Sequence, residues 1–296
     1  MRETALGEKR VKAPAFEYLR PASLNEALAL LGQHPEAKLL AGGQSLLASL
    51  NLRLSQPSHL IDIGRLPELR GITVTRGVLR IAALTRHVEL MASPEVAAHA
   101  PLLTAGVHHV AHPAIRTRGT IGGSLANADP AAELPACILA LGARLEIAGP
   151  SGSRRVAAAD FFTGLFGTAL EPTEILTAVE IDLPASGSIH GFQELARRSG
   201  DYAIVGLAAQ GQLSGLGFAA LRLAYFSVGS RTTLATNAAA ALIGPTASLD
   251  RATAALAHDL EPHDDLQANA ATRLHLARVL LRRVIGSMLP ATAIAA

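Results

Sequence analysis

Apolar positions near the start of the chain recur at the spacing of an amphipathic helix. Leu24, Leu28 and Leu31 are spaced so that they share one helix face. Ser23 stands just before this pattern and Glu26 lies in its first turn. These two residues form a capping box, in which a hydroxyl and a carboxylate accept hydrogen bonds from free N–H groups at a helix start. The pattern therefore predicts a capped helix that begins after Ser23.

Short apolar runs around a glycine pair complete a small α/β unit over residues 14–66. Strands are expected over 38–41 and 59–63, with a helical turn over 46–52 between them. The preceding residues, 1–13, are mostly polar and are expected to form a flexible lead-in. The first part of the chain is therefore predicted to be one subdomain behind a flexible segment.

The pattern changes from about residue 67, where hairpins and helices alternate as far as residue 186. Glu133–Leu141 is apolar after its first residue, and it is followed by Gly142, a residue type that commonly ends helices. We expect a second subdomain over 67–186 with these elements: a hairpin around Arg76-Gly77, a helix from Pro94 towards Val110, the helix Glu133–Leu141, a hairpin around residues 149–152, and a long strand over 174–183.

The small residues after Pro184 mark a boundary before a third region, 187–290. Its strands come first and its helices last, without the regular alternation of a doubly wound sheet, which indicates an α+β fold. The elements expected here are strands over 191–198, 204–213 and 221–228, and helices near 233–242, 249–257 and 266–288.

Composition narrows the possible functions. The 296 residues carry a net charge of +2, only 3% aromatic residues and no tryptophan, which is a poor basis for stacking on nucleic acid. No stretch reaches the roughly 18 apolar residues of a membrane span, and no apolar signal segment is visible, so we expect a cytoplasmic protein without a membrane span. The single cysteine, Cys137, excludes an internal disulfide and cannot supply an iron–sulfur cluster by itself.

Two glycine pairs carry the strongest chemical signal. The first pair lies between an apolar strand and a helical turn, and the second is accompanied by small residues and hydroxyls, with the carboxylate of Glu133 at a helix start soon after. Such loops let the backbone approach a ligand and point N–H groups at an anion. Neither loop has the lysine of a P-loop, so the pattern favours a tightly bound dinucleotide whose diphosphate is held by backbone amides. For either loop alone, an ordinary tight turn is the alternative. The candidate binding residues are Leu39, Leu40, Ala41, Gly42, Gly43, Gln44 and Ser45 in the first loop, and Thr120, Ile121, Gly122, Gly123 and Ser124 in the second.

Other motifs indicate structure rather than chemistry. Residues 215–220 match the dinucleotide fingerprint G-x-G-x-x-A, but a strand follows them instead of a helix, so we expect a hairpin turn. His108, His109 and His112 have no evident further ligand, so no metal site is assigned. No acid–base or nucleophilic set is evident and no catalytic residue is assigned, while Cys137 is expected in the core.

Several motifs occur in an order that resembles a known family. Together with both loops they make the chain similar to the FAD-binding medium subunit of molybdenum hydroxylases, the xanthine dehydrogenase and carbon monoxide dehydrogenase family. The resemblance extends over nearly the whole chain. Its further pieces are Phe16-Glu17-Tyr18-Leu19-Arg20-Pro21, Ile61-Asp62-Ile63, Asp129-Pro130-Ala131-Ala132-Glu133-Leu134-Pro135 and Arg198-Ser199-Gly200-Asp201-Tyr202-Ala203.

The resemblance implies a PCMH-type FAD-binding fold of two subdomains, followed by a C-terminal domain made of a three-stranded antiparallel sheet plus helices. FAD would lie between these parts with its diphosphate on the two loops. The further contacts implied are Asp129, Glu133, Leu176, Gln193 and Tyr202, with Tyr202 packed by the isoalloxazine ring. From the residues alone, Asp129 and Glu133 are also explained as a helix cap and a first-turn acid, and Tyr202 as a strand-edge aromatic.

Three positions qualify the resemblance. Gln44 stands where some family members carry histidine, which excludes a histidyl–flavin bond there. Ala82 replaces the glycine that is usual between Ile81 and Ala83, and Val110 matches another contact position only loosely.

The function that the resemblance implies is electron transfer. A large subunit would hydroxylate substrate at a molybdenum cofactor, and a small subunit would relay electrons through two 2Fe–2S clusters. This chain would collect the electrons on FAD and pass them to NAD, oxygen or a quinone. The alternatives are a self-contained PCMH-type flavin oxidase that acts directly on a small substrate, and an assembly module that has lost flavin.

Overall fold

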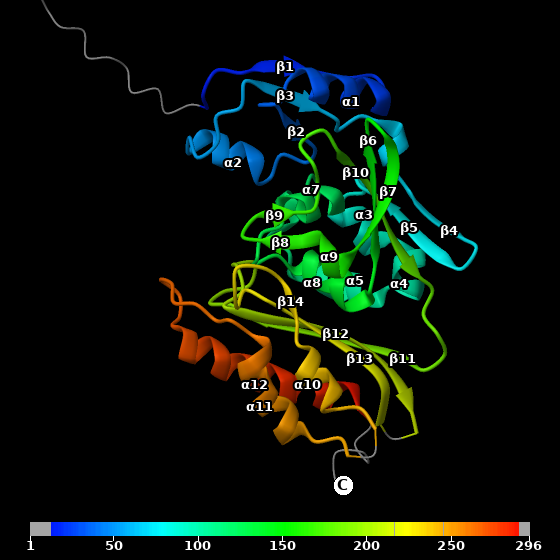
Figure 1. The fold of residues 1–296 in the computed structure, drawn as a ribbon, viewed down its shortest axis with the longest axis vertical. Helices are drawn as coiled ribbons and strands as arrows, with labels where there is room; N and C mark the ends of the chain where they lie inside the picture. Colours follow the sequence, from blue (N-terminus) through cyan, green and yellow to red (C-terminus); the bar gives the residue numbers. More distant parts are fainter. Residues whose placement is uncertain (1–12, 216, 245, 290–296) are drawn as a thin grey trace, which may run out of the picture.

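Three larger β-sheets of three, five and four strands, each with its own helices, follow one another along the molecule (Figure 1), and a small two-stranded sheet, β8-β9, accompanies the second of them. The computed structural model describes residues 13–215, 217–244 and 246–289, so the lead-in expected over 1–13 lies outside the described residues except for Ala13. Helices and strands mix in each part, which confirms the α+β class. Among the described helices, none has the length and apolar character needed to cross a membrane.

The first sheet is small and parallel, in the order β1-β3-β2. Its helix starts as predicted, because Ser23 Oγ accepts a hydrogen bond from Glu26 N at 3.2 Å and Glu26 Oε2 accepts one from Ala22 N at 2.7 Å. The elements of this part are β1 (Glu17–Leu19), α1 (Leu24–Gln33), β2 (Lys38–Leu40), α2 (Leu46–Asn51), β3 (His59–Asp62) and a 3-10 turn (Pro67–Leu69).

The second sheet is antiparallel, in the order β4-β5-β10-β6-β7. The two expected hairpins form its edges, and the long strand β10 lies at its centre. The strands are β4 (Ile72–Thr75), β5 (Val78–Ala82), β6 (Arg144–Gly149), β7 (Gly152–Ala157) and β10 (Ile175–Asp182).

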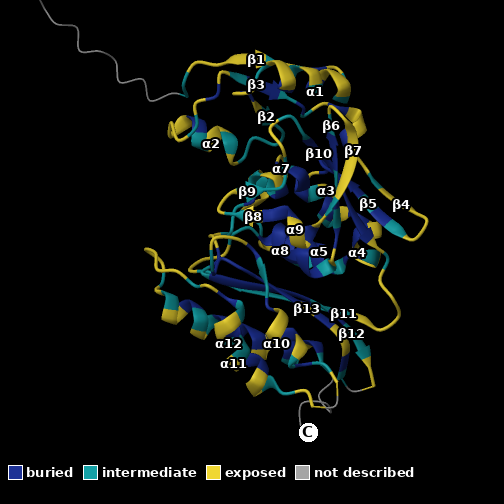
Figure 2. Ribbon diagram, viewed as in Figure 1, coloured by how far each residue is buried: buried dark blue, intermediate teal, exposed yellow. Residues whose placement is uncertain are grey.

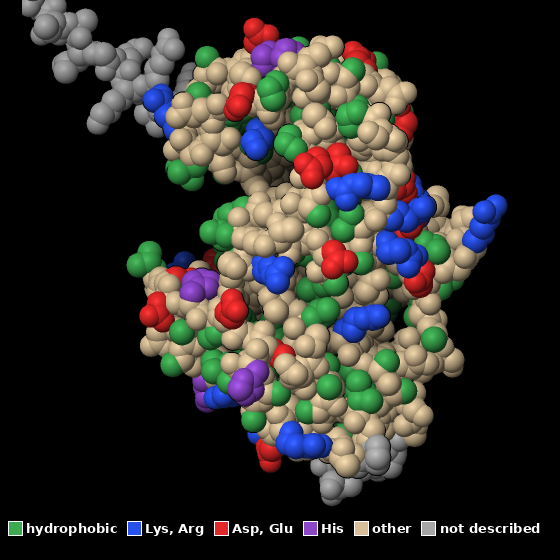
Figure 3. Space-filling model, in the orientation of Figure 1, with side chains coloured by type: hydrophobic (Ala, Val, Ile, Leu, Met, Phe, Trp, Pro, Cys, Tyr) green, Lys and Arg blue, Asp and Glu red, His purple; other side chains and the backbone are tan. Residues whose placement is uncertain are grey.

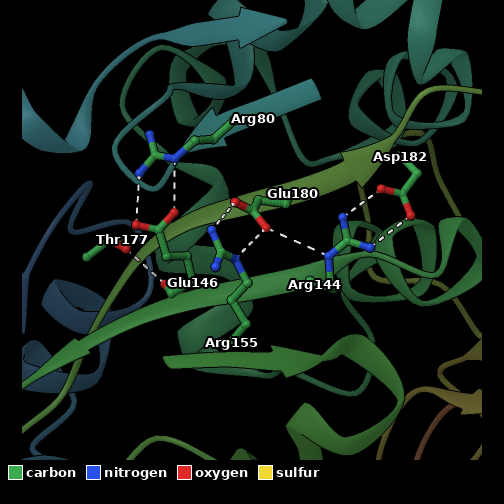
Figure 4. Close-up of polar contacts among 7 residues, drawn as sticks. All are labelled: Arg80, Arg144, Glu146, Arg155, Thr177, Glu180 and Asp182. Atoms are coloured by element: carbon green, nitrogen blue, oxygen red, sulfur yellow. Dashed lines mark hydrogen bonds and ion pairs between the residues drawn. The ribbon is translucent and has the colours of Figure 1, made fainter. Parts of the chain in front are cut away.

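One face of this sheet carries a ladder of paired charges (Figure 4). Strand geometry alternates the two faces, so Arg80 points outward while its neighbours Leu79 and Ile81 are fully buried. Hydrogen-bonded guanidinium groups hold the pKa values of Glu180 and Asp182 below their usual range. The pairs are Arg80 with Glu146 at 3.0 Å, Arg155 with Glu180 at 2.8 Å, and Arg144 with Asp182 at 2.6 Å.

Helices cover the other face of the second sheet. Helix α8 has the bounds predicted for it and ends at Gly142, which adopts a left-handed conformation with φ of 65°. Its residues from Glu133 to Ala140 are all buried, as expected for a helix that is apolar on every side. The remaining elements of this part are α3 (His87–Ala92), α4 (Pro94–His99), α5 (Pro101–His109), α6 (Pro113–Arg116), α7 (Ile121–Asn127), α8 (Glu133–Leu141), α9 (Ala158–Phe161), β8 (Phe162–Gly164) and β9 (Gly167–Thr168).

The third sheet is antiparallel, in the order β11-β12-β13-β14. It contains the three expected strands and a fourth, β14, which has only two residues. Strands β12 and β13 pair through Ser214 and Gly217, so the G-x-G-x-x-A segment forms a hairpin turn, as predicted. The elements are β11 (Ser188–Leu195), β12 (Val205–Ser214), β13 (Gly217–Phe226), β14 (Thr233–Leu234), α10 (Thr236–Ala240), α11 (Leu249–Asp259) and α12 (Ala270–Met288).

The last helix starts later than residue 266, where the sequence pattern placed it. Asn269 caps it by accepting a hydrogen bond from Thr272 N at 2.8 Å. Asp264 and Asp265 lie in the turn before it, where Asp265 pairs with the buried Arg273. A local polar turn therefore replaces the first helical turn that the apolar pattern suggested.

Each sheet contributes to a buried apolar cluster (Figure 2). The largest cluster combines α8 and the second sheet with residues of the third sheet, including Ala208 and Phe226. Leu84 and Ile175 join the cluster of the first part, so the first and second parts also share apolar contacts. These shared clusters fix the walls of the space that lies between the parts.

Candidate functional site

A cavity of about 900 Å³ lies between the first part of the chain and the second and third parts. The surface is indented between the uppermost part and the part below it (Figure 3). This volume is at the upper end of the range for ligand sites, as a dinucleotide requires. Fourteen of the seventeen candidate binding residues line it: Leu39, Ala41, Gly42, Gly43, Gln44, Ser45, Thr120, Gly122, Gly123, Ser124, Asp129, Glu133, Leu176 and Tyr202.

The other three candidates do not line the cavity. Leu40 belongs to β2, and Ile121 is fully buried at the start of α7. Gln193 lies on β11, opposite Leu207 of β12. Their places show that the two loop motifs include residues that support the wall from behind.

The two glycine loops touch each other at the cavity. A Cβ atom at Gly42 would lie 2.3 Å from the Arg118 carbonyl oxygen and 3.0 Å from Gly119 Cα, so no side chain fits at Gly42. A Cβ atom at Gly123 would lie 3.8 Å from Ala41 Cβ in the first loop. Residues about 80 positions apart in the sequence therefore meet at one place.

The first loop leaves its backbone donors free. Within the described residues, no acceptor binds the N–H groups of Gly43, Gln44, Ser45 and Leu46. The Gln44 side chain folds back and donates to the Gly42 carbonyl oxygen at 3.1 Å, which stabilises the turn. Because these residues line the cavity at the start of α2, their N–H groups are available to an anionic ligand.

The second loop uses its backbone donors internally. Ile121 N donates to Thr85 O at 3.0 Å, and Gly122 N donates to Ala83 O at 2.8 Å. Thr120 caps α7 and takes the next two donors, because its Oγ1 accepts from Gly123 N and its carbonyl accepts from Ser124 N. The second loop is thus a rigid wall, and the expectation that its N–H groups point at a ligand is not met for these four residues.

The charged residues of the cavity wall are mostly acidic. Lys38 is the only Lys or Arg among its described lining residues, whereas Asp129, Glu133, Glu171, Glu174 and Asp201 all contribute to it. A diphosphate held here would therefore rely mainly on backbone N–H groups. Asp129 Oδ1 accepts a hydrogen bond from Ala131 N at 2.9 Å, so Asp129 shapes the turn before α8.

Glu133, the first residue of α8, is the most perturbed carboxylate at the cavity. Burial is the main cause that raises its pKa to about 7, and the Glu194 and Asp129 carboxylates act in the same direction, while a backbone hydrogen bond and His109 act in the opposite direction. The Glu194 side chain is only 6% exposed, and its Oε1 lies 3.2 Å from His109 Nδ1. Perturbed, buried carboxyl groups in a cavity are typical of functional sites.

Exposed aromatic side chains stand at the same cavity. Tyr202 is 61% exposed and Phe166, at the tip of the β8–β9 hairpin, is 57% exposed. Phe166 also has a φ of 51°, which is rare for a bulky residue. Exposed aromatic rings beside a cavity suit a planar ligand that stacks on them.

Sequence reasoning did not single out several lining residues. His87 and Ile115 belong to segments without a recognisable motif, so nothing short of the fold places them at the cavity. Val110, which matched the family loosely, does line it. Ala82, the departure from the usual glycine, is buried and is not a lining residue, so the substitution lies away from the cavity surface.

This fold and this cavity define a protein that can bind a ligand of dinucleotide size beside two glycine loops. Two protein-family models match the sequence. The family described as the FAD binding domain in molybdopterin dehydrogenase matches residues 14–184, and the family described as the CO dehydrogenase flavoprotein C-terminal domain matches residues 190–288. The chain therefore belongs to the family of FAD-binding medium subunits of molybdenum hydroxylases.

Similar proteins carry names from the same family. The carbon monoxide dehydrogenase medium chain of Hydrogenophaga pseudoflava is 37% identical over 93% of this chain and 97% of its own length. The nicotine 6-hydroxylase medium subunit of Paenarthrobacter nicotinovorans is 37% identical over 93% of this chain and 98% of its own length.

Solved structures agree in fold. A chain of the carbon monoxide dehydrogenase of Hydrogenophaga pseudoflava has a TM-score of 0.91 at 38% identity, covering 93% of this chain and 98% of that chain. A chain of quinoline 2-oxidoreductase from Pseudomonas putida 86 has a TM-score of 0.88 at 41% identity, covering 94% and 98%. FAD is thus the cofactor of this chain, and the free N–H groups, the large cavity and the exposed Tyr202 fit it.

Proposed function

We propose that this chain receives electrons from the 2Fe–2S clusters of a small partner subunit and delivers them through FAD to NAD, oxygen or a quinone. A large partner subunit with a molybdenum cofactor would oxidise the substrate, and we propose a cytoplasmic location for the complex. The observation that carries the proposal is the cavity, where two glycine loops, Glu133 and Tyr202 meet. When bound, FAD supplies the two-electron redox chemistry.

The residues of the chain have binding and positioning roles in this proposal. The free N–H groups of residues 43–46 and the start of α2 would bind the diphosphate. The second loop would form a rigid opposite wall, and Tyr202 would pack against the flavin ring. Glu133 and Asp129 would lie near the same end, where the buried Glu133 can hold a proton at neutral pH.

The single cysteine supports the placement of the clusters in a partner. Cys137 is fully buried in α8, and its thiol points to the Leu102 carbonyl oxygen at 3.6 Å. One inward-facing thiol cannot provide the set of ligands that a 2Fe–2S cluster requires. This supports our proposal that the 2Fe–2S clusters lie in a partner chain.

The experiment compares the purified chain with the complex formed with its two partner subunits. Substrates such as carbon monoxide, nicotine and quinoline are added without oxygen, and flavin absorbance is followed. We expect a member of such a panel to bleach the flavin in the complex and none to bleach it in the chain alone. Bleaching in the isolated chain would contradict the proposal and favour a self-contained flavin oxidase.

A further inference from the structure

A buried histidine at the cavity has no hydrogen-bond partner. His87 is only 4% exposed, and among the described residues neither Nδ1 nor Nε2 is hydrogen-bonded. The Thr120 carbonyl lies nearby but does not meet hydrogen-bonding geometry. Leaving a buried polar group unsatisfied costs stability, so such a group needs an explanation.

The position of His87 connects it to both glycine loops. It is the first residue of α3, and its backbone N donates to the Gly119 carbonyl at 2.9 Å. A Cβ at Gly119 would lie 2.9 Å from His87 Cε1 and 3.1 Å from His87 Nδ1, so the imidazole occupies the space beside Gly119. Gly119 Cα in turn lies against Gly42, and all three residues line the cavity.

The imidazole of His87 is neutral near pH 7, so it can donate one hydrogen bond and accept another. Burial lowers its pKa to about 4, and the Arg116 guanidinium acts in the same direction. A neutral imidazole offers one N–H donor and one acceptor nitrogen. The junction of the loops is thus a place where a donor is held in position without a partner from the protein.

We propose that His87 is a cofactor-binding residue, whose imidazole N–H donates to an oxygen of the phosphate–ribose portion of FAD at the junction of the two loops. The inference rests on the proposed function, because it assumes that FAD occupies the cavity. The acceptor would be an oxygen near Gly119, which lies beside His87, and Gly42, which lies against Gly119 at the junction of the loops. His87 would then add a side-chain donor to the backbone donors of the first loop.

The test compares apoprotein stability with cofactor affinity in the full chain. His87→Leu removes the ring nitrogens, and His87→Asn retains a donor. His190→Leu is the matched control, since His190 is a partly buried histidine on β11 that does not line the cavity. Thermal unfolding without FAD gives the stability, and quenching of flavin fluorescence on titration gives the dissociation constant.

We expect His87→Leu to unfold at the same temperature as the unsubstituted apoprotein or higher, and to bind FAD about tenfold more weakly, which corresponds to about 1.4 kcal/mol. His87→Asn should remain within about threefold of the unsubstituted chain, and His190→Leu should bind FAD normally. The same loss should appear when ADP, which lacks the flavin ring, is titrated as a competitor.

Two results would overturn the inference. If His87→Leu binds FAD like the unsubstituted chain, or if its apoprotein is strongly destabilised while His87→Asn restores stability but not affinity, then His87 has a structural role only. An unsubstituted chain that binds no FAD would instead contradict the proposed function, and the inference with it. The two failures are therefore distinguishable in one set of titrations.

Discussion

The two glycine loops share a sequence pattern but differ in where their backbone N–H groups go. In the first loop the donors of residues 43–46 have no acceptor within the described part of the chain. In the second loop the donors of residues 121–124 are taken by Thr85, Ala83 and Thr120. One loop is thus open to a ligand, and the other is closed onto its own fold.

The difference teaches that a pair of glycines serves two purposes at one site. In the first loop, Gly43 has a φ of 73°, so it allows the turn that exposes the donors. In the second loop, Gly122 permits close packing, since a Cβ there would lie 2.5 Å from Ala83 Cβ. We therefore expect substitutions in the first loop to reduce affinity, and those in the second to reduce stability.

The largest expected effect is that of Gly122→Val. The new side chain meets Ala83 Cβ at 2.5 Å and the Ala83 carbonyl oxygen at 2.7 Å, and a backbone neighbour cannot move cheaply. We expect the free energy of unfolding to fall by more than about 3 kcal/mol in urea titrations of the apoprotein. Gly32→Ala in α1 is the control, because nothing lies within 4 Å of its added Cβ, and it should be neutral or stabilising. Equal effects of the two substitutions would refute the packing role of the second loop.

Glu133, the acid that follows the second loop, predicts a dependence of stability on pH. Glu133 has a pKa raised from 4.5 to about 7, so the unfolded chain releases this proton at lower pH than the folded chain does. Stability should therefore fall as pH rises from about 4.5 to 7, and then stay reduced. Glu133→Gln should remove this loss and stabilise the apoprotein by about 2 kcal/mol at pH 8 and not at pH 4.

The control for this titration is Glu180→Gln on the charged sheet face. Its hydrogen bond with Arg155 lowers the pKa of Glu180, so its contribution has the opposite sign and is lost as pH falls. If both substitutions shift the pH profile of stability in the same direction, the distinction between a functional and a structural carboxylate is wrong.

A smaller effect is expected from Gly43→Ala in the first loop. Alanine at a φ of 73° is strained, which should cost about 1 kcal/mol of stability, and relief of that strain redirects the loop donors. We expect the dissociation constant of FAD to rise about tenfold in a fluorescence titration. Unchanged affinity in a folded variant would mean that the first loop does not bind the diphosphate.

The smallest effect should come from Thr120→Val. It removes the cap in which Thr120 Oγ1 accepts from Gly123 N at 3.1 Å, at a cost of about 1 kcal/mol. Ser23→Ala, which removes the equivalent cap of the distant helix α1, is the matched control. Both variants should unfold at similarly lowered temperatures and bind FAD like the unsubstituted chain. A loss of FAD affinity in Thr120→Val, but not in Ser23→Ala, would instead show that the second loop contacts FAD directly.

Local signals in the sequence predicted much of this fold. The helix Glu133–Leu141 with Gly142 after it, the two edge hairpins and the capped helix α1 follow from capping, periodicity and turn chemistry. The start of α12 was placed too early, because the polar turn around Asp265 depends on Arg273 further along the chain. The same local signals cannot reveal pairings that form only in the folded chain.

The candidate site, too, could be predicted only in part from local sequence signals. Both loops were located, yet their different roles depend on acceptors at Thr85 and Ala83, which are more than 30 residues away from the second loop in sequence. His87 has no motif and becomes visible only through its burial and its missing partner. Similarly, Glu133 and Glu180 are one residue type with opposite pKa shifts, since one faces a cavity and the other faces arginines.

The most direct test of the account is the visible absorption spectrum of the purified chain, followed by identification of the cofactor released on denaturation. We predict oxidised-flavin bands and release of FAD, with both lost in Gly43→Trp and Gly123→Trp, since each places a large side chain in the cavity between the loops. A colourless protein that cannot be reconstituted with FAD, even beside its partner subunits, would contradict the account and leave an assembly module as the better explanation.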